Sequence, residues 1–215
     1  MGAEKVYLRP ITAEDTTKVV AWRNKDFVRK NFIYQKPFTE EGHMTWFREQ
    51  VETGHVAQFI ICVAASEGCR EKNGGAENYG SEDVQSSTEK VYKTDAEGFY
   101  REVGSVYLRD IDREAGTAEY GVFIGEEDAL GRGYGTKAAK LMLAYGFEKL
   151  GLNKIFLRFL ADNTGAKKSY EKAGFQMIEG RRETVNLVQG KKAVFFMETE
   201  RGMWESTRCL RMENV

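Results

Sequence analysis

The segment from Thr117 to Leu160 constrains the fold more than any other part of the sequence. It opens with an apolar stretch, Thr117 to Ile124, and continues through a polar loop that contains glycines, Gly125 to Arg132. Tyr134 then begins a stretch whose apolar residues repeat at helical spacing, and a second apolar stretch, Ile155 to Leu160, follows it. This order predicts a strand, a crossover helix and a parallel strand, joined by a right-handed connection. A chain built around such a unit is expected to fold as an α/β protein.

Weaker patterns predict the elements on either side of this unit. Before it, we expect a strand, two helices and two antiparallel strands: Val6–Arg9, a helix from Thr12, a helix from Thr39, and Ala57–Ala65 with Glu102–Leu108. After it, we expect a short helix, a strand and a closing hairpin: Thr164–Lys172, a strand from Phe175, and Val185–Val188 with Ala193–Glu198. Gly174 stands where the short helix should end, because glycine adopts the left-handed conformation that closes many helices.

Residues 66–100 separate the two antiparallel strands and differ in composition from the rest of the chain. They are dominated by Glu, Gly, Ser, Asn and Lys, and have too few apolar residues to form a core of their own. The segment is also far longer than an ordinary hairpin loop. A chain of 215 residues is within the size range of one domain. We therefore predict a single domain over residues 1–215 that carries a polar insertion at about 66–100.

Charge and hydropathy limit the partners and the compartment. Lys and Arg number 32 and Asp and Glu number 33, so no global positive field exists to attract nucleic acid or an anionic membrane. The sequence has no apolar run of membrane length and no signal peptide at its start, and its three cysteines do not form a disulfide framework. We therefore expect a cytoplasmic protein. The two histidines lack the spacing of a zinc motif, so we expect no metal.

The glycines between Leu130 and Thr136 lie where the polar loop becomes the crossover helix. At such a junction the free backbone N–H groups and the positive end of the helix dipole attract an anion, and glycine lets a phosphate approach the backbone. Arg132 adds a charge there, and a plain glycine turn is the alternative. A P-loop is disfavoured because Thr136 precedes Lys137, which reverses the order of that motif. A dinucleotide-binding fingerprint ranks second, because the glycines follow their strand only after a long loop.

A second motif supports the anion site. Asn163 and Tyr170 are seven positions apart on the next short helix, so both side chains share one face if that helix starts at Asn163. Together with the strand and the glycine loop, they give three motifs in order over Glu119 to Phe175. This segment resembles the acetyl-CoA-binding half of the GNAT superfamily of N-acetyltransferases. The resemblance implies a GNAT fold, in which helices flank a mixed, strongly twisted sheet and acetyl-CoA binds at a splay between two parallel strands.

The resemblance also assigns roles to individual residues. It implies that the pantetheine arm of acetyl-CoA binds the backbone of Val122, Phe123 and Ile124. It implies that the pyrophosphate binds the backbone of Arg132, Gly133, Tyr134, Gly135 and Thr136. Asn163 would contact the pantetheine or acetyl region, and Tyr170 would face the thioester sulfur. The family usually has Gln or Arg at the first position of the phosphate loop, where this chain has Leu130, so one side-chain contact is missing.

The transfer of an acetyl group to an amine needs two proton movements. A phenol keeps its proton at neutral pH, so Tyr170 suits the donor that protonates the departing thiolate, with packing as its alternative role. Glu119 precedes the pantetheine contacts on the same strand and shares a face with Gly121 and Phe123. It is our candidate for the base that receives the amine proton, directly or through a water. A salt bridge on the sheet is an equal alternative for Glu119.

The N-terminal third is expected to hold the acceptor amine. The sequences Trp22-Arg23-Asn24 and Val28-Arg29-Lys30 resemble the GNAT branch that contains ribosomal-protein N-terminal acetyltransferases and nucleotide-linked amino-sugar acetyltransferases. The candidates for acceptor binding are Arg23, Asn24 and Arg29, although a charged run at a helix end is more often solvated.

The sequence as a whole predicts an acetyl-CoA-dependent N-acetyltransferase that acts directly on a primary amine. The acceptor is expected to be a nucleotide-linked amino sugar or another small molecule. Acetylation of protein N-termini and a non-catalytic CoA-binding sensor or scaffold are the alternatives. The oligomeric state stays open, with a homodimer among the options.

Overall fold

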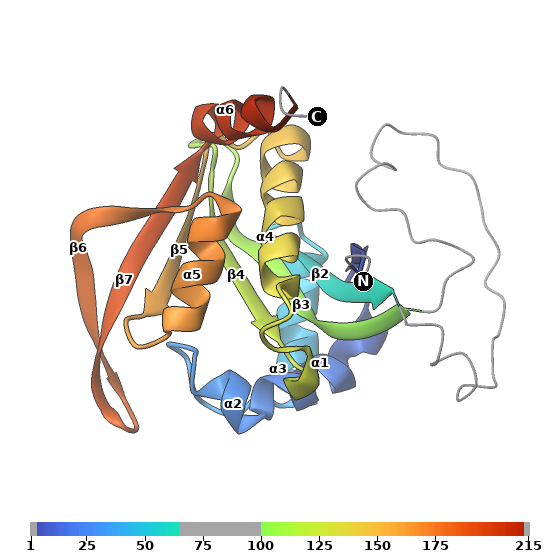
Figure 1. Cartoon of the computed structure of the whole chain (residues 1–215). Coiled ribbons are helices and arrows are strands. Elements are labelled where there is room, and N and C mark those ends of the chain that lie inside the picture. Colours follow the sequence, from blue (N-terminus) through green and yellow to red (C-terminus); the bar gives the residue numbers. More distant parts are fainter. Residues whose placement is uncertain (1–3, 65–99, 213–215) are drawn as a thin grey trace, which may run out of the picture.

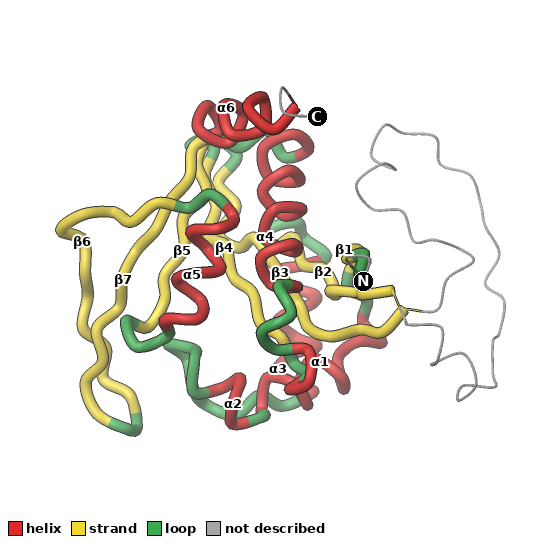
Figure 2. The backbone as a smooth tube through the Cα atoms, viewed as in Figure 1, coloured by secondary structure: helices red, strands yellow, loops and turns green. Residues whose placement is uncertain are grey.

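The computed structural model describes residues 4–64 and 100–212. Of the predicted insertion, residues 66–99 lie outside the described residues, and Tyr100 already belongs to a strand. The described strands form one sheet in the order β1-β2-β3-β4-β5-β7-β6 (Figures 1 and 2). Their bounds are β1 Val6–Pro10, β2 Ala57–Ala64, β3 Tyr100–Asp112, β4 Thr117–Ile124, β5 Lys154–Leu160, β6 Gln176–Leu187 and β7 Gly190–Glu200. The sheet is mixed, because β4 and β5 are parallel while all other neighbours are antiparallel.

Helices cover both faces of this sheet. They are α1 Thr16–Asn24, α2 Asp26–Arg29, α3 Glu40–Trp46, α4 Tyr134–Ala144, α5 Thr164–Ala173 and α6 Arg201–Met212. Short 3-10 turns, η1 Ala13–Asp15 and η4 Glu127–Ala129, precede α1 and α4, and π-helical turns, η2 Phe47–Val51 and η5 Tyr145–Lys149, continue α3 and α4. The largest part of the core lies between the sheet and α4 with α5, and a second cluster lies beneath α1, α2 and α3 on the opposite face. Helix α6 lies across one end of the molecule (Figure 1).

The alternation of side chains along β4 separates the two faces. Ala118 and Tyr120 are buried in the cluster beneath α4 and α5, whereas Phe123 is buried with Trp22 and Val28 beneath α1 and α2. Glu119 and Gly121 therefore point to the same side as Phe123, because successive side chains of a strand point to opposite faces. This confirms the predicted shared face of Glu119, Gly121 and Phe123.

Most predicted elements are confirmed, including the parallel unit and the left-handed Gly174, whose φ is 114°. The closing hairpin is longer than predicted, since β6 and β7 begin at Gln176 and Gly190. The sequence-based prediction did not include α6. That helix is anchored by a tertiary contact, in which the Trp204 ring lies 5.4 Å from the Phe147 ring, and such a contact leaves no local signal.

Candidate active site at the divergence of β4 and β5

The parallel pair at the centre of the sheet separates along its length (Figure 1). The two strands are in register over three pairs, the last of which joins Glu119 to Phe156. Beyond that pair β4 continues to Ile124 and β5 continues to Leu160. Backbone groups alternate between the two edges of a strand, so those of Tyr120 to Ile124 that do not pair with β3 face the gap. An extended ligand that carries amide groups matches these donors and acceptors.

The loop after β4 presents an anion-binding helix start. Gly131 and Gly133 have φ values of 73° and 79°, and a Cβ atom at either position would meet no atom within 4 Å. Gly133 is the N-cap of α4, and no side chain caps that helix. The first N–H groups of α4 therefore lack intrahelical partners and lie next to open space, as a phosphate site requires. The chain reaches this arrangement through glycine because other residues rarely adopt a positive φ.

The residues predicted to bind the pyrophosphate make different side-chain contacts. The Arg132 Nε atom donates a hydrogen bond to the Asp128 carbonyl at 2.8 Å, which holds the exposed side chain along the loop. The Tyr134 hydroxyl donates to the Glu4 carboxylate, so only its backbone faces the helix start. The Thr136 and Ser169 hydroxyl groups are 2.8 Å apart and connect α4 to α5. The loop thus offers backbone N–H groups and Arg132 for an anion.

Tyr170 lies on α5 in an aromatic environment beside the gap. Its side chain is 8% exposed, and its ring is 5.8 Å from Phe159 and 6.0 Å from Tyr120. Within the described residues its hydroxyl has no hydrogen-bond partner, which leaves the donor available. Burial, and secondarily the neighbouring Tyr107 hydroxyl, raises the pKa of Tyr170 well above its usual value. Tyr170 therefore stays protonated at neutral pH and above.

Asn163 is the N-cap of α5 rather than part of its first turn. Its Oδ1 atom accepts a hydrogen bond from the Ala166 N–H at 3.1 Å, and the helix begins at Thr164. The side chain is thus fixed by a standard capping contact. Its amide NH2 group, which the cap does not use, is the part that a ligand could engage.

Glu119 lies at the last paired position of β4 and β5, on the face opposite to α5. Its carboxylate accepts hydrogen bonds from Arg109 Nη2 at 2.9 Å and from Arg158 Nε and Nη2, each at 3.1 Å. Arg109 belongs to β3 and Arg158 to β5, so the carboxylate links three strands at the point where β4 and β5 part. The salt-bridged state considered from the sequence is therefore the state that the structure contains.

Tyr107 occupies the space above Gly121, and sequence reasoning missed it. The two residues are directly opposite each other on β3 and β4. A Cβ atom at Gly121 would lie 2.3 Å from the Tyr107 Cζ atom, so only glycine leaves room for this phenol. Burial raises the pKa of Tyr107, and the positive charges of Arg23, Arg109 and Arg158 oppose that shift. The available signal was Gly121 itself, since a glycine inside a strand often marks a close approach.

The three predicted acceptor residues have different environments. Arg23 is 8% exposed and lies among the rings of Phe32, Phe38 and Phe123. Asn24 bonds the backbone of Phe38 with both polar ends of its amide, at 2.9 Å and 2.8 Å. Asn24 therefore positions Phe38 instead of offering its amide to a ligand. Arg29 pairs with Asp26 of the same short helix at 2.6 Å, so it is partnered near the surface and does not join Arg23.

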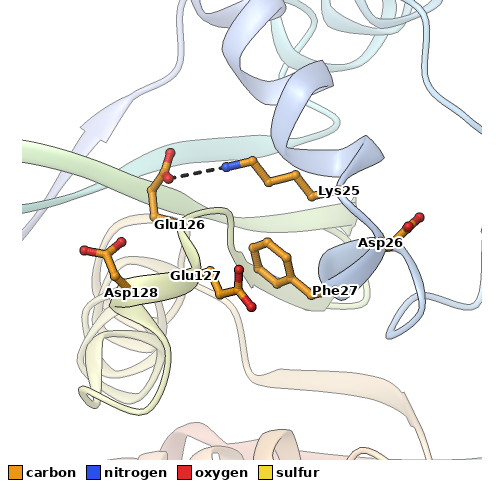
Figure 3. A pocket seen from close by; sticks show the side chains of 6 residues that line it. All are labelled: Lys25, Asp26, Phe27, Glu126, Glu127 and Asp128. Carbon is orange, nitrogen blue, oxygen red and sulfur yellow. Dashed lines mark hydrogen bonds and ion pairs between the residues drawn. The ribbon is translucent and has the colours of Figure 1, made fainter.

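A cavity of about 750 Å³ lies to one side of this region (Figure 3). It is lined by Lys25, Asp26, Phe27, Glu126, Glu127 and Asp128, from the α1–α2 junction and the β4–α4 loop. Carboxylates dominate the lining, which does not suit a phosphate, and none of Tyr170, Glu119 or Arg23 contributes to it. We therefore place the candidate site at the divergence of β4 and β5 and not in this cavity.

Two further observations concern the described residues alone. No helix among them combines the length and apolar character needed to cross a bilayer. No group of three or more His, Cys, Asp or Glu side chains among them is arranged to hold a metal ion.

Comparison with known proteins identifies the family. The model of the acetyltransferase (GNAT) domain matches residues 5–176. An uncharacterised protein of Methanocaldococcus jannaschii is 26% identical over 180 residues, which cover 83% of this chain and 30% of that protein. Spermidine N(1)-acetyltransferase of Escherichia coli is 33% identical over 97 residues, which cover 45% of this chain and 50% of that enzyme. The chain thus spans half or less of the length of these relatives.

Solved structures share the fold at low sequence identity. Spermidine N-acetyltransferase of Vibrio cholerae, solved with CoA and spermine, has a TM-score of 0.69 and 18% identity, with 93% of this chain and 97% of that chain covered. A domain from Methanocaldococcus jannaschii has a TM-score of 0.63 and 21% identity, with 92% and 99% covered. The matched family model spans most of the chain, and the divergent parallel strands and glycine-started helix lie within its range. The chain is a member of the GNAT acetyltransferase family.

Proposed function

We propose that this protein transfers the acetyl group of acetyl-CoA directly to a primary amine. The observation that carries the proposal is the divergence of β4 and β5 next to the uncapped start of α4. The gap offers unpaired backbone groups to the amides of a pantetheine arm, and the helix start offers N–H groups to a pyrophosphate. The gap and the helix start are adjacent, as the pantetheine arm and the pyrophosphate are in acetyl-CoA. The GNAT family of the chain supports the same ligand.

The residues proposed to hold acetyl-CoA follow from these features. The backbone of Val122, Phe123 and Ile124 would bind the pantetheine arm along the gap. The pyrophosphate would be bound by the backbone of Arg132, Gly133, Tyr134, Gly135 and Thr136, with the Arg132 charge nearby. The Asn163 amide would contact the arm from the start of α5. Bound acetyl-CoA supplies an activated acetyl thioester, and the protein positions the amine against it.

Tyr170 is proposed to donate a proton, or a hydrogen bond, to the departing sulfur. Its hydroxyl is protonated because burial raises its pKa, and it has no competing partner in the described part of the chain. Glu119 is proposed to receive the amine proton. Because Oε2 already accepts two hydrogen bonds and Oε1 only one, a water on Oε1 is the route that we propose.

The acceptor is proposed to be a nucleotide-linked amino sugar or another small amine that reaches the Glu119 face. Acetylation of protein N-termini is the second candidate. A CoA-binding sensor without catalysis is the candidate of another class, and the free hydroxyl of Tyr170 favours the enzyme over it.

Ligand-dependent melting tests the proposal. CoA and acetyl-CoA should raise the melting temperature, because a ligand that binds only the folded state stabilises it, whereas NAD should not. Gly135→Leu places a side chain at the helix start and should abolish the CoA shift. Gly202→Leu in α6 is the matched control, because a Cβ atom meets nothing within 4 Å at Gly202 and only the Ser169 Oγ atom, at 3.7 Å, at Gly135. Stabilisation by NAD and none by CoA would reject the proposal.

A further inference from the structure

Arg23 is a buried cation that no described residue neutralises. It lies in the last turn of α1, with the centre of its guanidinium 3.3 Å from the Phe32 ring centroid and 4.5 Å from that of Phe38. Its Nη1 atom is buried and has no hydrogen-bond partner. Within residues 4–64 and 100–212 the side chain forms no ion pair either. Aromatic rings attract the charge but do not accept a hydrogen bond from Nη1, so a costly buried donor persists in this structure.

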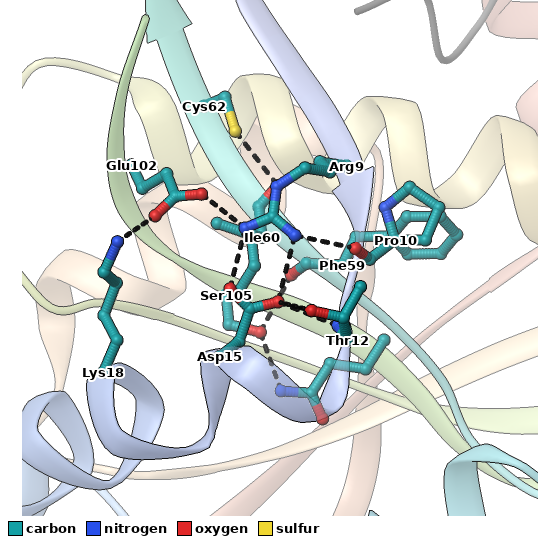
Figure 4. Close-up of polar contacts among 11 residues, drawn as sticks. Arg9, Pro10, Thr12, Asp15, Lys18, Phe59, Ile60, Cys62, Glu102 and Ser105 are labelled. Carbon is teal, nitrogen blue, oxygen red and sulfur yellow. Dashed lines mark hydrogen bonds and ion pairs between the residues drawn. The ribbon is translucent and has the colours of Figure 1, made fainter. Parts of the chain in front are cut away.

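A partly buried arginine, Arg9, shows the contacts that a structural guanidinium makes in this protein. Arg9 of β1 belongs to a junction cluster with Asp15, Lys18 and Glu102 (Figure 4). Its Nη atoms donate to the two Asp15 oxygens at 3.0 Å and 2.8 Å and also to Glu102. Lys18 of α1 completes the cluster through Glu102. The partly buried Arg9 is therefore paired with two carboxylates, whereas the buried Arg23 has none among the described residues.

The charges around Arg23 reinforce this difference. Burial lowers the pKa of Arg23 to about 10; Tyr107 acts in the opposite direction, and Arg109 lowers the pKa further. Among the described residues, no carboxylate counts among the causes of that shift. Arg109 and Arg158, in turn, share Glu119, and Arg109 also lies 3.6 Å from Asp110. We call Arg23, Tyr107, Arg109, Glu119 and Arg158 the site cluster, in which Arg23 is the cation without a counter-charge.

The position of Arg23 relates it to the acetyl-transfer site. Phe123, which the guanidinium contacts, and Gly121, which Tyr107 covers, are two residues apart on one face of β4. A rise of about 3.3 Å per residue separates them by about 7 Å. A group bound at Arg23 would thus lie several bonds from an amine that is held over the gap.

We propose that Arg23 forms a subsite for an anionic group, a carboxylate or a phosphate, that the acceptor carries beside its amine; this inference rests on the proposed acetyl transfer. The planar fork of the guanidinium matches two oxygens of either anion, and the surrounding rings exclude competing water. A polycation such as spermidine would meet a like charge here. The acceptor class is therefore a primary amine that bears an anion, which differs from the polyamines in the names of the related enzymes.

Matched pairs of acceptors test the subsite. CoA release is measured at saturating acetyl-CoA with glucosamine 6-phosphate against glucosamine, with β-alanine against propylamine, and with spermidine. In the parent protein, kcat/KM for the anionic acceptor should exceed that for its partner at least tenfold in one or both pairs. The first pair tests a phosphate and the second a carboxylate.

The ratio of the two kcat/KM values, anionic acceptor to partner, should fall to about one in Arg23→Met and to an intermediate value in Arg23→Lys. Arg48→Met, which removes an exposed charge, should retain it. A ratio near one in the parent for both pairs, a preference for spermidine, or an unchanged ratio in Arg23→Met would overturn the inference.

A binding measurement without turnover separates this inference from the proposed reaction. Inorganic phosphate is added while CoA is saturating, so that the pyrophosphate loop is already filled. Phosphate should then raise the melting temperature of the parent protein but not of Arg23→Met, whose own CoA-induced shift shows that it is folded. If phosphate raises the melting temperature only when Arg23 is present and no amine is acetylated, the proposed acetyl transfer is rejected and the anion subsite is retained. If the phosphate shift persists in Arg23→Met, the subsite is rejected whatever the enzyme assay shows.

Discussion

The junction cluster and the site cluster lie on the same side of the sheet, and their polar groups are arranged in opposite ways. In the junction cluster, Arg9 is bonded to Asp15 and Glu102, and these contacts connect η1 and β3 to the first strand. In the site cluster, the buried Nη1 atom of Arg23 has no hydrogen-bond partner among the described residues. Buried polar groups that are fully satisfied support the fold, whereas unsatisfied ones are more often kept for a ligand. Substitutions should therefore separate stability from activity in the two clusters.

The largest effect is expected at the edge of the site cluster. Tyr170→Phe keeps the ring contacts with Phe159 and Tyr120 and removes only the hydroxyl. Turnover should fall by about 10- to 1000-fold, on the scale of general acid catalysis. The dissociation constant of acetyl-CoA and the melting temperature should change little. Single-turnover kinetics, which establish that chemistry limits the rate, provide the measurement. An unchanged rate would make Tyr170 a packing residue.

Arg9→Met should have the largest effect on stability. It leaves the Asp15 and Glu102 carboxylates without their main partner. We expect a loss of about 3 kcal/mol in the free energy of unfolding, which is the low end of the range for a broken buried ion pair. The low end applies because the paired side chains are partly exposed. The control, Arg101→Met, breaks an exposed pair with Asp128 and should cost much less, because solvent screens exposed pairs. Urea denaturation measures both. Equal effects of the two substitutions would remove the distinction between the clusters.

Glu119→Gln tests whether the site cluster supplies the base. If Glu119 accepts the amine proton, the rate should fall by about 10- to 100-fold at neutral pH. Raising the pH should recover part of this loss, because more of the acceptor amine is then deprotonated in solution. If Glu119 only holds Arg109 and Arg158 across the strands, the loss should not depend on pH. The ratio of variant to parent kcat/KM between pH 7 and 9 distinguishes the two roles.

Acid should weaken the junction cluster selectively. Burial alone would raise the pKa values of Asp15 and Glu102, but hydrogen bonds from Arg9 and Lys18 outweigh it and lower both. A lowered pKa in the folded state gives stability that is present above the unfolded pKa and is lost as the pH falls through the folded value. As the pH falls from about 5 to 3, the parent should therefore lose stability through these groups. Arg9→Met should show a smaller decline, and an identical decline would contradict the assignment.

The smallest effect is expected for the stability of Arg23→Met. Removal of an unpaired buried charge costs the fold nothing, and the thioether can pack against Phe32 and Phe38. The free energy of unfolding should stay within about 1 kcal/mol of the parent value or rise, although acceptor selectivity is lost. A loss comparable to that of Arg9→Met would show that Arg23 supports the structure.

The elements from β4 to α5 were predictable because their signals are local. Glycines at the start of α4 and after α5, and apolar periodicity in β4 and β5, fix each element within a few residues. The link from Arg109 through Glu119 to Arg158 was not predictable, since it depends on the register of three strands. Arg23 and Arg29 are both basic residues near a helix end, and sequence reasoning grouped them. Only tertiary packing places Arg23 among three rings while Arg29 pairs with Asp26.

The early end of the pairing between β4 and β5 has one more consequence. From Tyr120 onward, β4 is an edge strand inside the sheet, because only its β3 side is hydrogen-bonded. Edge strands accept added strands, and a peptide-like arm with amide groups can take that place by β-augmentation. The described sheet of seven strands is therefore open at its centre as well as at its outer strands, β1 and β6. An amide-bearing substrate would fill the central opening beside β4. Amide hydrogen exchange along Tyr120 to Ile124 should slow when that substrate binds.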